Sequence, residues 1–402
     1  MRVAVVSGFL PSKHNLKGPT ALPYQLLKYA PNNVEIDLYY FPLWYEVETP
    51  ESVLMEDLHS LPLKNIYTVT RPNHFVQNYV NWRNRRQGLP GGLNLFPVNQ
   101  TIVNKINLSK PELVWLYPHW LVNWIDHINS HKIVVSGMDS SVLHTERLIR
   151  YGKWQTADEV SWAVHALREN TKLEAMLGLK PVKVHMVGIN DVKKYAFVSG
   201  QVEQAFYSPH PHYDYLSIKS TLTRSEKKVT VLFSGGGDNV YVGNHLKHVI
   251  NSLVDAAEIL SSRFNFLFIG SNYKQYVDSL LSVGYSVDFI NWVDDYSKAL
   301  SEALIQIFPI AVGSGTKGKV LQAFASGLLA IGSDIAFENI SVIPGKDCLQ
   351  YHNPEDVSSL LIKVLNDLPF YEKMAASGAQ KVREKHAPEY TSKIFWEKIL
   401  QD

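Results

Sequence analysis

The chain has 402 residues, too many for one ordinary hydrophobic core, so we expect roughly two domains of about 150–200 residues each. Hydrophobic residues make up 46% and charged residues 19%, as in ordinary globular enzymes. A net charge of +1, from 39 basic and 38 acidic residues, excludes the strong positive field that would favour a nucleic-acid partner.

Short β-branched segments alternate with amphipathic segments along the chain, which is typical of parallel sheets covered by helices on both faces. In the first half, strands are predicted at 2–7, 34–40, 113–117, 132–136 and 183–187. In the second half, they are predicted at 229–233, 264–270, 285–290, 304–310 and 328–332. We therefore expect an α/β protein with two doubly wound, Rossmann-like domains that face a cleft.

The predicted domains are divided by a polar stretch with two prolines and no apolar periodicity. It predicts an N-terminal domain at 1–206, a linker at 207–228 and a C-terminal domain at 229–375. Helices at 376–402 are expected to return to the N-terminal domain. In open α/β sheets, ligands bind beyond the carboxyl ends of the strands, so the loops that follow strands are the candidate sites.

The segment from His59 to Lys110 contains no Asp or Glu, and aromatic residues are interleaved with its cations. Such a surface can rest on anionic headgroups, grip the diphosphate of a lipid-linked acceptor or bind a polysaccharide. The alternative is a solvated basic face with aromatic residues in the core. Candidate acceptor or membrane residues are Trp82, Arg83, Arg85, Arg86 and, after the third strand, Trp120, for which packing is the alternative.

The stretch SGGGDN at 234–239 directly follows a predicted strand. Its glycines, Gly235, Gly236 and Gly237, allow close backbone approach and positive φ angles, and their amides can bind phosphate. A plain tight turn is the alternative interpretation of this loop.

The stretch AVGSGTKGKVLQAFASG at 311–327 follows another predicted strand and leads into a helix from Lys317 to Ala325. Helix N-termini attract anions, and Gly315 with Thr316 would let a phosphate approach closely. Lys317 or Lys319 would add positive charge there. Gln322 lies one turn beyond Lys319, where a neutral amide can bind a base, ribose or sugar hydroxyl. A surface helix with solvated lysines is the alternative.

The run GSGTKGKVLQAFASGLLAI resembles the sugar-nucleotide loop and helix of group 1 glycosyltransferases, which have the GT-B fold. The preceding segments VTVLFSGGGDN, FNFLFIGSN and VDFINWVDD occur in a similar order. The resemblance implies a nucleotide-sugar donor, and it alone implies a uridine base. Retaining members usually keep a Glu at the position of Gln322.

The inverting xanthan glucuronosyltransferase family resembles this chain in having a Lys followed three residues later by Gln, as Lys319 and Gln322 are here. The segment 137–164 also resembles that family's loop with a catalytic Asp, then a long helix, then a strand at the segment's end. This resemblance implies that Asp139 is the catalytic base.

Independent chemistry also favours Asp139, which follows the predicted strand 132–136 and opens a predicted helix at 140–151. Inverting transfer needs one carboxylate to take the proton of an acceptor hydroxyl as it attacks the anomeric carbon. The alternative, which is compatible with catalysis, is an N-cap for the helix.

We expect no metal cofactor, because no Asp-x-Asp pair occurs in the chain and a cationic helix terminus can stabilise the departing diphosphate instead. The histidines of the HPH stretch at 210–212 are expected to be solvated rather than metal ligands. Cys348 is the only cysteine, so no intrachain disulfide can form and a reducing compartment is favoured.

The N-terminal apolar run is too short for a secretory signal, and no stretch reaches the roughly 18 apolar residues of a membrane span. We expect a cytoplasmic protein, soluble or attached peripherally to the inner membrane face. The favoured function is a metal-independent, inverting hexosyl- or glycuronosyltransferase of polysaccharide biosynthesis that acts on a glycan or lipid-linked acceptor. A retaining GT-B transferase, a nucleotide-sugar epimerase of the same architecture and a non-catalytic sugar-binding protein are the alternatives.

Overall fold

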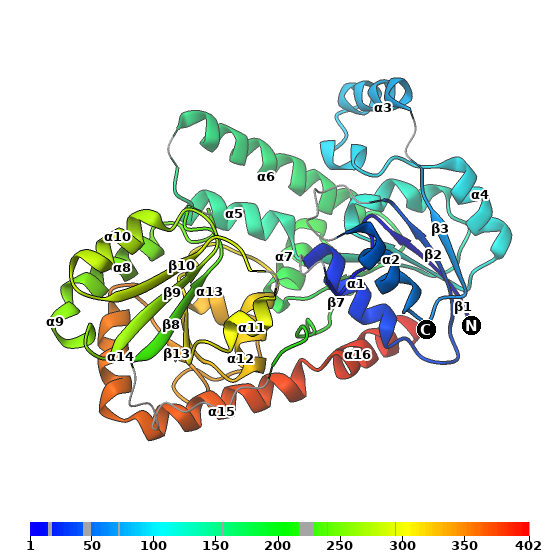
Figure 1. Ribbon diagram of the computed structural model, residues 1–402. Helices are drawn as coiled ribbons and strands as arrows, with labels where there is room; N and C mark the ends of the chain where they lie inside the picture. The colour runs from blue at the N-terminus through cyan, green and yellow to red at the C-terminus, as the bar shows by residue number, and fades with distance from the viewer. Residues whose placement is uncertain are drawn as a thin grey trace. The chain divides into compact units, whose positions relative to one another are not determined.

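A computed structural model describes residues 1–14, 18–42, 50–70, 73–154, 156–216, 228–238, 240–293 and 295–401 (Figure 1). The chain divides into two compact units. The first contains Met1–Glu146, Val160–Pro211 and Pro388–Asp402, and the second contains Arg147–Glu159 and His212–Ala387. The chain passes between the units at Pro211, within the stretch predicted as a linker, of which residues 217–227 lie outside the described residues.

The first unit is built on a parallel sheet in the order β3-β2-β1-β4-β5-β6-β7. Its strands are β1 (Arg2–Ser7), β2 (Glu35–Tyr40), β3 (Asn65–Thr68), β4 (Leu113–Tyr117), β5 (Ile133–Met138), β6 (Lys183–Met186) and β7 (Ala205–Tyr207). Its helical elements are α1 (Gly18–Lys28), α2 (Glu51–His59), α3 (His74–Arg86), η1 (Gly91–Asn94), α4 (Gln100–Ser109), η2 (His119–His127), α5 (Ser141–Tyr151), α6 (Ala157–Gly178), α7 (Ile189–Ser199) and α16 (Pro388–Leu400). Helices α5 and α6 also extend into the residues of the second unit.

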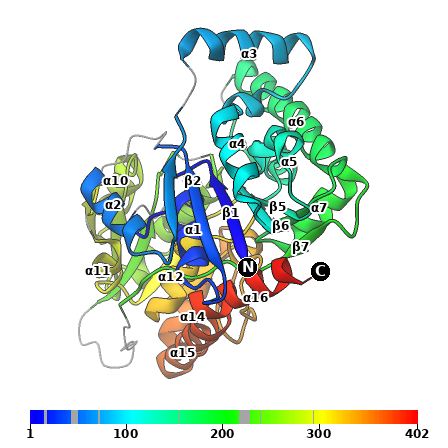
Figure 2. The same cartoon turned by 90° about the vertical axis from the view of Figure 1, so that its right-hand side faces the viewer.

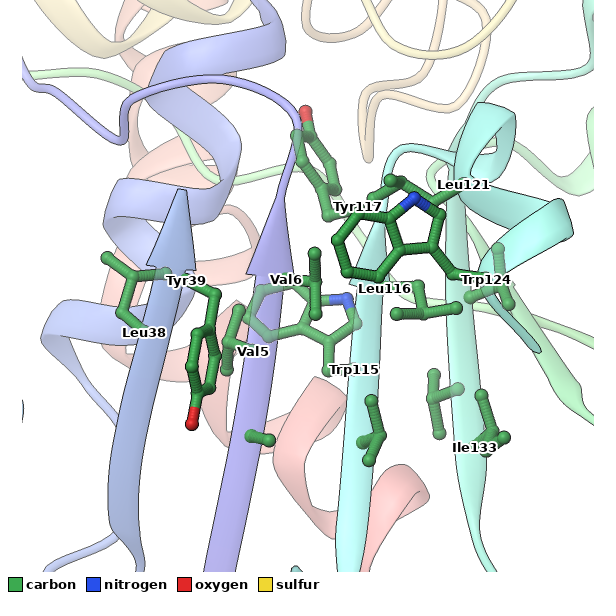
Figure 3. Close-up of a cluster of buried hydrophobic side chains, with 14 of the residues drawn as sticks. Val5, Val6, Leu38, Tyr39, Trp115, Leu116, Tyr117, Leu121, Trp124 and Ile133 are labelled. Atoms are coloured by element: carbon green, nitrogen blue, oxygen red, sulfur yellow. The ribbon is translucent and has the colours of Figure 1, made fainter. Parts of the chain in front are cut away.

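The core of this unit lies along its central strands, β1, β2, β4 and β5, and Figure 3 shows some of its buried side chains. All five residues of β4 are buried, because a central parallel strand is covered on both faces. Trp115 and Tyr117 of β4 are among the largest fully buried side chains. The last helix, α16, packs on α1, where the indole Nε1 of Trp396 donates to the carbonyl of Leu26 at 2.8 Å.

The second unit is built on a parallel sheet in the order β10-β9-β8-β11-β12-β13. Its strands are β8 (Val229–Ser234), β9 (Phe264–Ile269), β10 (Ser286–Ile290), β11 (Ile305–Phe308), β12 (Leu329–Gly332) and β13 (Leu349–Gln350). Its helices are α8 (His245–Asp255), α9 (Ala257–Leu260), α10 (Lys274–Ser282), α11 (Tyr296–Leu300), α12 (Gly318–Ser326), α13 (Asp334–Phe337), α14 (Asp356–Asn366) and α15 (Leu368–Lys385).

Successive residues of β8 and β9 point to opposite faces of this sheet and pack into two separate clusters. Val231, Phe233, Phe266 and Phe268 join the cluster that contains apolar residues of α8, α10 and α14. Leu232, Leu267 and Ile269 join the cluster built around α12. The sheet is therefore covered by helices on both faces, as in a Rossmann-like domain.

The predicted fold class is confirmed, and each of the ten strands predicted from the alternating pattern corresponds to a strand of the structure. The three that were not predicted are β3, β7 and β13, with four, three and two residues. All three lie at sheet edges, where a strand is too short to show a hydrophobic pattern.

The prediction of a strand at the end of segment 137–164, which came from the family resemblance, is wrong, because residues from Ala157 onward form the first turns of α6. Asp158 and Glu159 lie in the first turn of that helix, where carboxylates are stabilised by the helix dipole. The histidines of the HPH stretch are also not solvated: His210 and His212 are buried.

Candidate functional site

The first candidate site lies in the second unit, where β8 and β11 are neighbours in the sheet and run parallel. The glycine loop follows β8, and the loop that leads into α12 follows β11, so both loops lie at the same edge of the sheet. A Cβ atom built on Gly235 would lie 3.9 Å from Nζ of Lys319. The structure therefore brings together two segments that sequence analysis selected separately.

The glycine loop is held in place by its own backbone hydrogen bonds. The amide of Gly235 donates to Ile269 at 2.9 Å, and the amide of Gly237 donates to Ser271 at 2.9 Å. Among the described residues, the amide of Gly236 has no partner, so it alone of the three is open to a ligand. Gly235 has a φ angle of 125°, a conformation that only glycine adopts easily.

The helix α12 begins at Gly318, close to the predicted start, and ends before Gly327, whose φ of 103° makes the expected left-handed C-cap. No side chain caps its N-terminus. The amides of Gly318 and Lys319 donate to no partner among the described residues, as expected for the first turn of a helix. Tyr213 packs against Gly318 so closely that a Cβ there would lie 2.7 Å from its ring.

The two candidate lysines of this loop have different environments. Lys317 is nearly buried and donates to the carbonyl of Gly315 at 3.2 Å, and its Nζ lies 3.5 Å from a carboxylate oxygen of Glu338. Lys319 is exposed and forms no ion pair with a described residue. Its Nζ lies 5.6 Å from the centre of the Tyr296 ring, and desolvation by the surrounding protein lowers its pKa.

An accessible ammonium group without a counter-ion, next to free amides at a helix N-terminus, is an arrangement that binds anions. Lys319, the first amides of α12 and the amide of Gly236 supply these donors. Lys317 instead belongs to the framework that shapes the loop. The two lysines could not be distinguished from the sequence, because Glu338, the counter-ion of Lys317, comes from a segment 21 residues away.

Glu338 is the centre of that framework and was not predicted. Arg147 donates to both of its carboxylate oxygens, at 2.6 and 2.8 Å, and also to the carbonyl of Gly313 at 2.6 Å. The side chain of Asn339 donates to the carbonyl of Gly315 at 2.8 Å. These bonds fix the loop that precedes Thr316. Thr316 itself is partly buried.

Gln322 is only 1% exposed, and its amide group is used within the protein. Its Nε2 donates to the backbone carbonyl of Asp214 at 3.2 Å and to the hydroxyl of Ser297 at 3.1 Å. A carbonyl oxygen can only accept, so an ionised Glu at this position would face it unpaired. The local hydrogen bonding thus explains why Gln suits this position better than Glu.

The second candidate site lies in the first unit, where Asp139 follows β5 and precedes α5. Asp139 is half-buried, and its amide donates to the carbonyl of Gly137 at 2.6 Å. The hydroxyl of Ser140, rather than Asp139, accepts from the amide of Leu143 at 3.1 Å and caps α5. The alternative role of Asp139 as this cap is therefore wrong.

Two buried carboxylates that sequence analysis missed hold the start of α5. Glu174 accepts from the hydroxyl of Ser140 at 2.9 Å and from the amide of Val142 at 3.1 Å, and Asp191 accepts from the amide of Ser140 at 2.8 Å. Burial raises the pKa of Glu174 to about 7, and the negative charge of Asp139 contributes in the same direction.

His119 completes the surroundings of Asp139. It is buried, and burial lowers the pKa of its imidazole to about 4 against the opposing effect of the Asp139 charge. Its Nε2 lies 3.3 Å from the hydroxyl of Ser141. Of the three carboxylates of this group, Asp139 is half-buried, whereas Glu174 and Asp191 are fully buried.

The residues predicted as an acceptor or membrane surface fall into two environments. Trp82, Arg83, Arg85 and Arg86 are exposed on α3. Trp120 is half-buried and stacks on Phe96 with ring centres 6.2 Å apart, against the core of the unit. Packing thus accounts for Trp120 in this structure.

Each unit is a doubly wound domain built on a parallel sheet, with strand-to-helix loops at the carboxyl ends of its strands. Two such domains in one chain define the GT-B class of architecture. Solved structures confirm this class along the whole chain. Sucrose-phosphate synthase from Thermosynechococcus elongatus is 13% identical, with a TM-score of 0.60 and coverage of 100% of this chain and 98% of that one. HepE from Anabaena, in complex with UDP and glucose, is 10% identical, with a TM-score of 0.63 and full coverage of both chains.

A UDP-forming α,α-trehalose-phosphate synthase from Burkholderia vietnamiensis is likewise 10% identical, with a TM-score of 0.61 and full coverage of both chains. No curated protein sequence matches this chain. Residues 237–367, however, match the family of group 1 glycosyltransferases. The comparisons therefore support a glycosyltransferase: the GT-B fold extends along the whole chain, and the group 1 match is confined to the C-terminal unit, which contains the motifs that predicted it.

Proposed function

We propose that this glycosyltransferase uses a UDP-sugar donor and binds its diphosphate at the start of α12. The observation that carries the proposal is the exposed, unpaired Lys319 beside free amides at a helix N-terminus. The structural neighbours in complex with UDP or UDP-glucose support the same donor class. Thr316 and the glycine loop 235–237 would lie along the phosphates.

We further propose that Asp139 is the general base of an inverting transfer. Its carboxylate takes the proton of an acceptor hydroxyl, whose oxygen forms the new bond to the anomeric carbon. The bond from that carbon to the diphosphate breaks, and UDP leaves with the electron pair. Asp139 is half-buried, whereas the neighbouring Glu174 and Asp191 are fully buried, which supports Asp139 as the carboxylate that an acceptor hydroxyl can reach.

The leaving diphosphate is stabilised in this proposal by Lys319 and backbone amides, without a metal ion. Among the described residues, no group of three His, Cys, Asp or Glu side chains is placed to hold a metal. Transfer should therefore continue in EDTA at an unchanged rate. Loss of activity in EDTA that Mg²⁺ or Mn²⁺ restores would contradict this part of the proposal.

The acceptor is proposed to be a glycan or a lipid-linked sugar at the inner face of the membrane, in polysaccharide biosynthesis. None of the described helices is long and apolar enough to cross a bilayer.

The test is incubation of the full chain with a panel of UDP-sugars and sugar acceptors, with release of UDP and the anomeric configuration of the product measured. Asp139→Asn should abolish transfer while UDP binding is kept, and Asp126→Asn, an exposed carboxylate of the same unit, is the matched control. Near-normal turnover of Asp139→Asn would refute the base assignment. Interconversion of the donor sugar without an acceptor would instead indicate an epimerase.

Retention of configuration is the second candidate mechanism, because retaining enzymes are among the structural neighbours. A product with the anomeric configuration of the donor, together with an active Asp139→Asn variant, would establish it. The family assignment and the donor site would be unaffected by that result.

A further inference from the structure

In helix α3 (His74–Arg86), the orientation of the polar and aromatic faces is the reverse of that in an ordinary amphipathic helix. Its polar side faces the protein: Asn84 is 6% exposed and donates to the side chain of Asn94 in η1 at 2.8 Å. The side-chain oxygen of Asn81 is also buried. Its aromatic side faces solvent, with Phe75 exposed by 87%, Tyr79 by 59% and Trp82 by 51%. Figures 1 and 2 show α3 standing apart from the sheet of its own unit.

The exposed rings form a continuous stripe along α3. Phe75, Tyr79, Trp82 and Arg86 are spaced by four, three and four residues, so they share one face of the helix. The Tyr79 and Trp82 ring centres are 5.9 Å apart, and the guanidinium of Arg86 lies 4.8 Å from the centre of the Trp82 ring. Moving such a stripe out of water lowers the free energy of the system. We therefore expect a binding partner to cover this surface.

Positive charge flanks this stripe on both sides. At about 100° per residue, Arg83 and Arg85 project on opposite sides of the line of rings. Both are exposed, as is Arg86, and none of the three forms an ion pair with a described residue. The surrounding segment from His59 to Lys110 has no acidic residue that could neutralise them.

We propose that α3 is a docking surface for an anionic lipid bilayer, with its rings at the headgroup level and its arginines on lipid phosphates. Aromatic rings and arginines on one helix are the combination that lies in a membrane interface. A polysaccharide would account for the rings but not for the three arginines without ion pairs, one at the end of the stripe and one on each side of it. The proposal rests on α3 alone and does not depend on which sugar is transferred or on the stereochemistry.

The test is sedimentation of the full chain with vesicles of phosphatidylcholine, with and without 30% phosphatidylglycerol, at low and high salt. We expect binding to the anionic vesicles only, and weaker binding as salt rises. Phe75→Ser combined with Trp82→Ser should reduce the vesicle partition coefficient by at least about tenfold, because two exposed rings no longer leave water on binding.

Charge reversal of Arg83, Arg85 and Arg86 to Glu should reduce binding by about 100-fold or more, at about fivefold for each lost cation. The matched controls lie on α7 of the same unit: Phe197→Ser, at an exposed ring, and Lys193→Glu, at an exposed cation. Both should bind vesicles as the unchanged protein does. Circular dichroism and UDP affinity of every variant verify that the chain is folded.

Equal binding to neutral and anionic vesicles, or full binding by the α3 variants, would overturn the proposal. So would a dimer in analytical ultracentrifugation that the ring variants abolish, because a second copy of the chain would then cover the stripe. Since UDP release from the donor is measured without vesicles, failure of membrane binding and failure of the proposed transfer are separate outcomes.

Discussion

Replacing Lys319 by Met should weaken UDP binding strongly, because it removes the only charged donor proposed for the diphosphate and keeps the length of the side chain. Lys319 has no carboxylate partner among the described residues, so its charge is available to a ligand. A hydrogen bond to a charged group contributes about 1.5–3 kcal/mol. The dissociation constant of UDP should therefore rise by about 10- to 150-fold.

The assay is isothermal titration calorimetry of the full chain with UDP. The control is Lys274→Met, which changes an exposed lysine at the first position of another helix of the same unit, α10. The control should bind UDP normally. An unchanged affinity in Lys319→Met would refute the anion site at the start of α12.

The same substitution should have the opposite effect on the protein without nucleotide. Desolvation lowers the pKa of Lys319, so the folded state disfavours its charged form relative to the unfolded chain. This destabilisation is fully present below the folded pKa and is lost as pH rises from the folded pKa to the higher pKa of the unfolded chain. Lys319→Met should therefore be more stable than the unchanged protein at neutral pH, with a smaller advantage at alkaline pH. Urea unfolding at both pH values measures this difference.

Two further substitutions test the groups that support the sites. Gln322→Glu should cost about 2–4 kcal/mol of unfolding free energy, because a buried carboxylate would face the carbonyl of Asp214, whereas Gln275→Glu at an exposed position should cost almost nothing. The unchanged protein should lose up to about 3 kcal/mol of stability as pH rises from 4.5 to 8, because Glu174, with a folded pKa of about 7, is ionised less easily in the folded than in the unfolded chain. Glu174→Gln has no such group, so its stability relative to the unchanged protein should rise by the same amount. Urea unfolding across pH measures both, and a pH-independent difference for Glu174→Gln would contradict its raised pKa.

The sequence alone was sufficient to predict the helices and strands that are specified by residues within the element itself. Buried parallel strands such as β4 and β8 are continuous apolar runs, and α12 has its glycine stop encoded directly after its last turn. The loops after β8, β11 and β5 were also identifiable, because catalytic and binding groups of parallel sheets lie at strand ends. The strands at the sheet edges were not, because two to four residues carry no periodicity.

Tertiary structure decided what the charged residues of those loops do. Lys317 and Lys319 are two positions apart in sequence, yet of the two only Lys317 forms an ion pair with Glu338 in the part of the chain that the structure describes. Ser140 caps α5, and it is held by hydrogen bonds to Glu174 and Asp191, which lie 34 and 51 residues further along the chain. The free energy of a charge depends on partners and burial, which are set by segments distant in the chain. A local pattern contains no information about them.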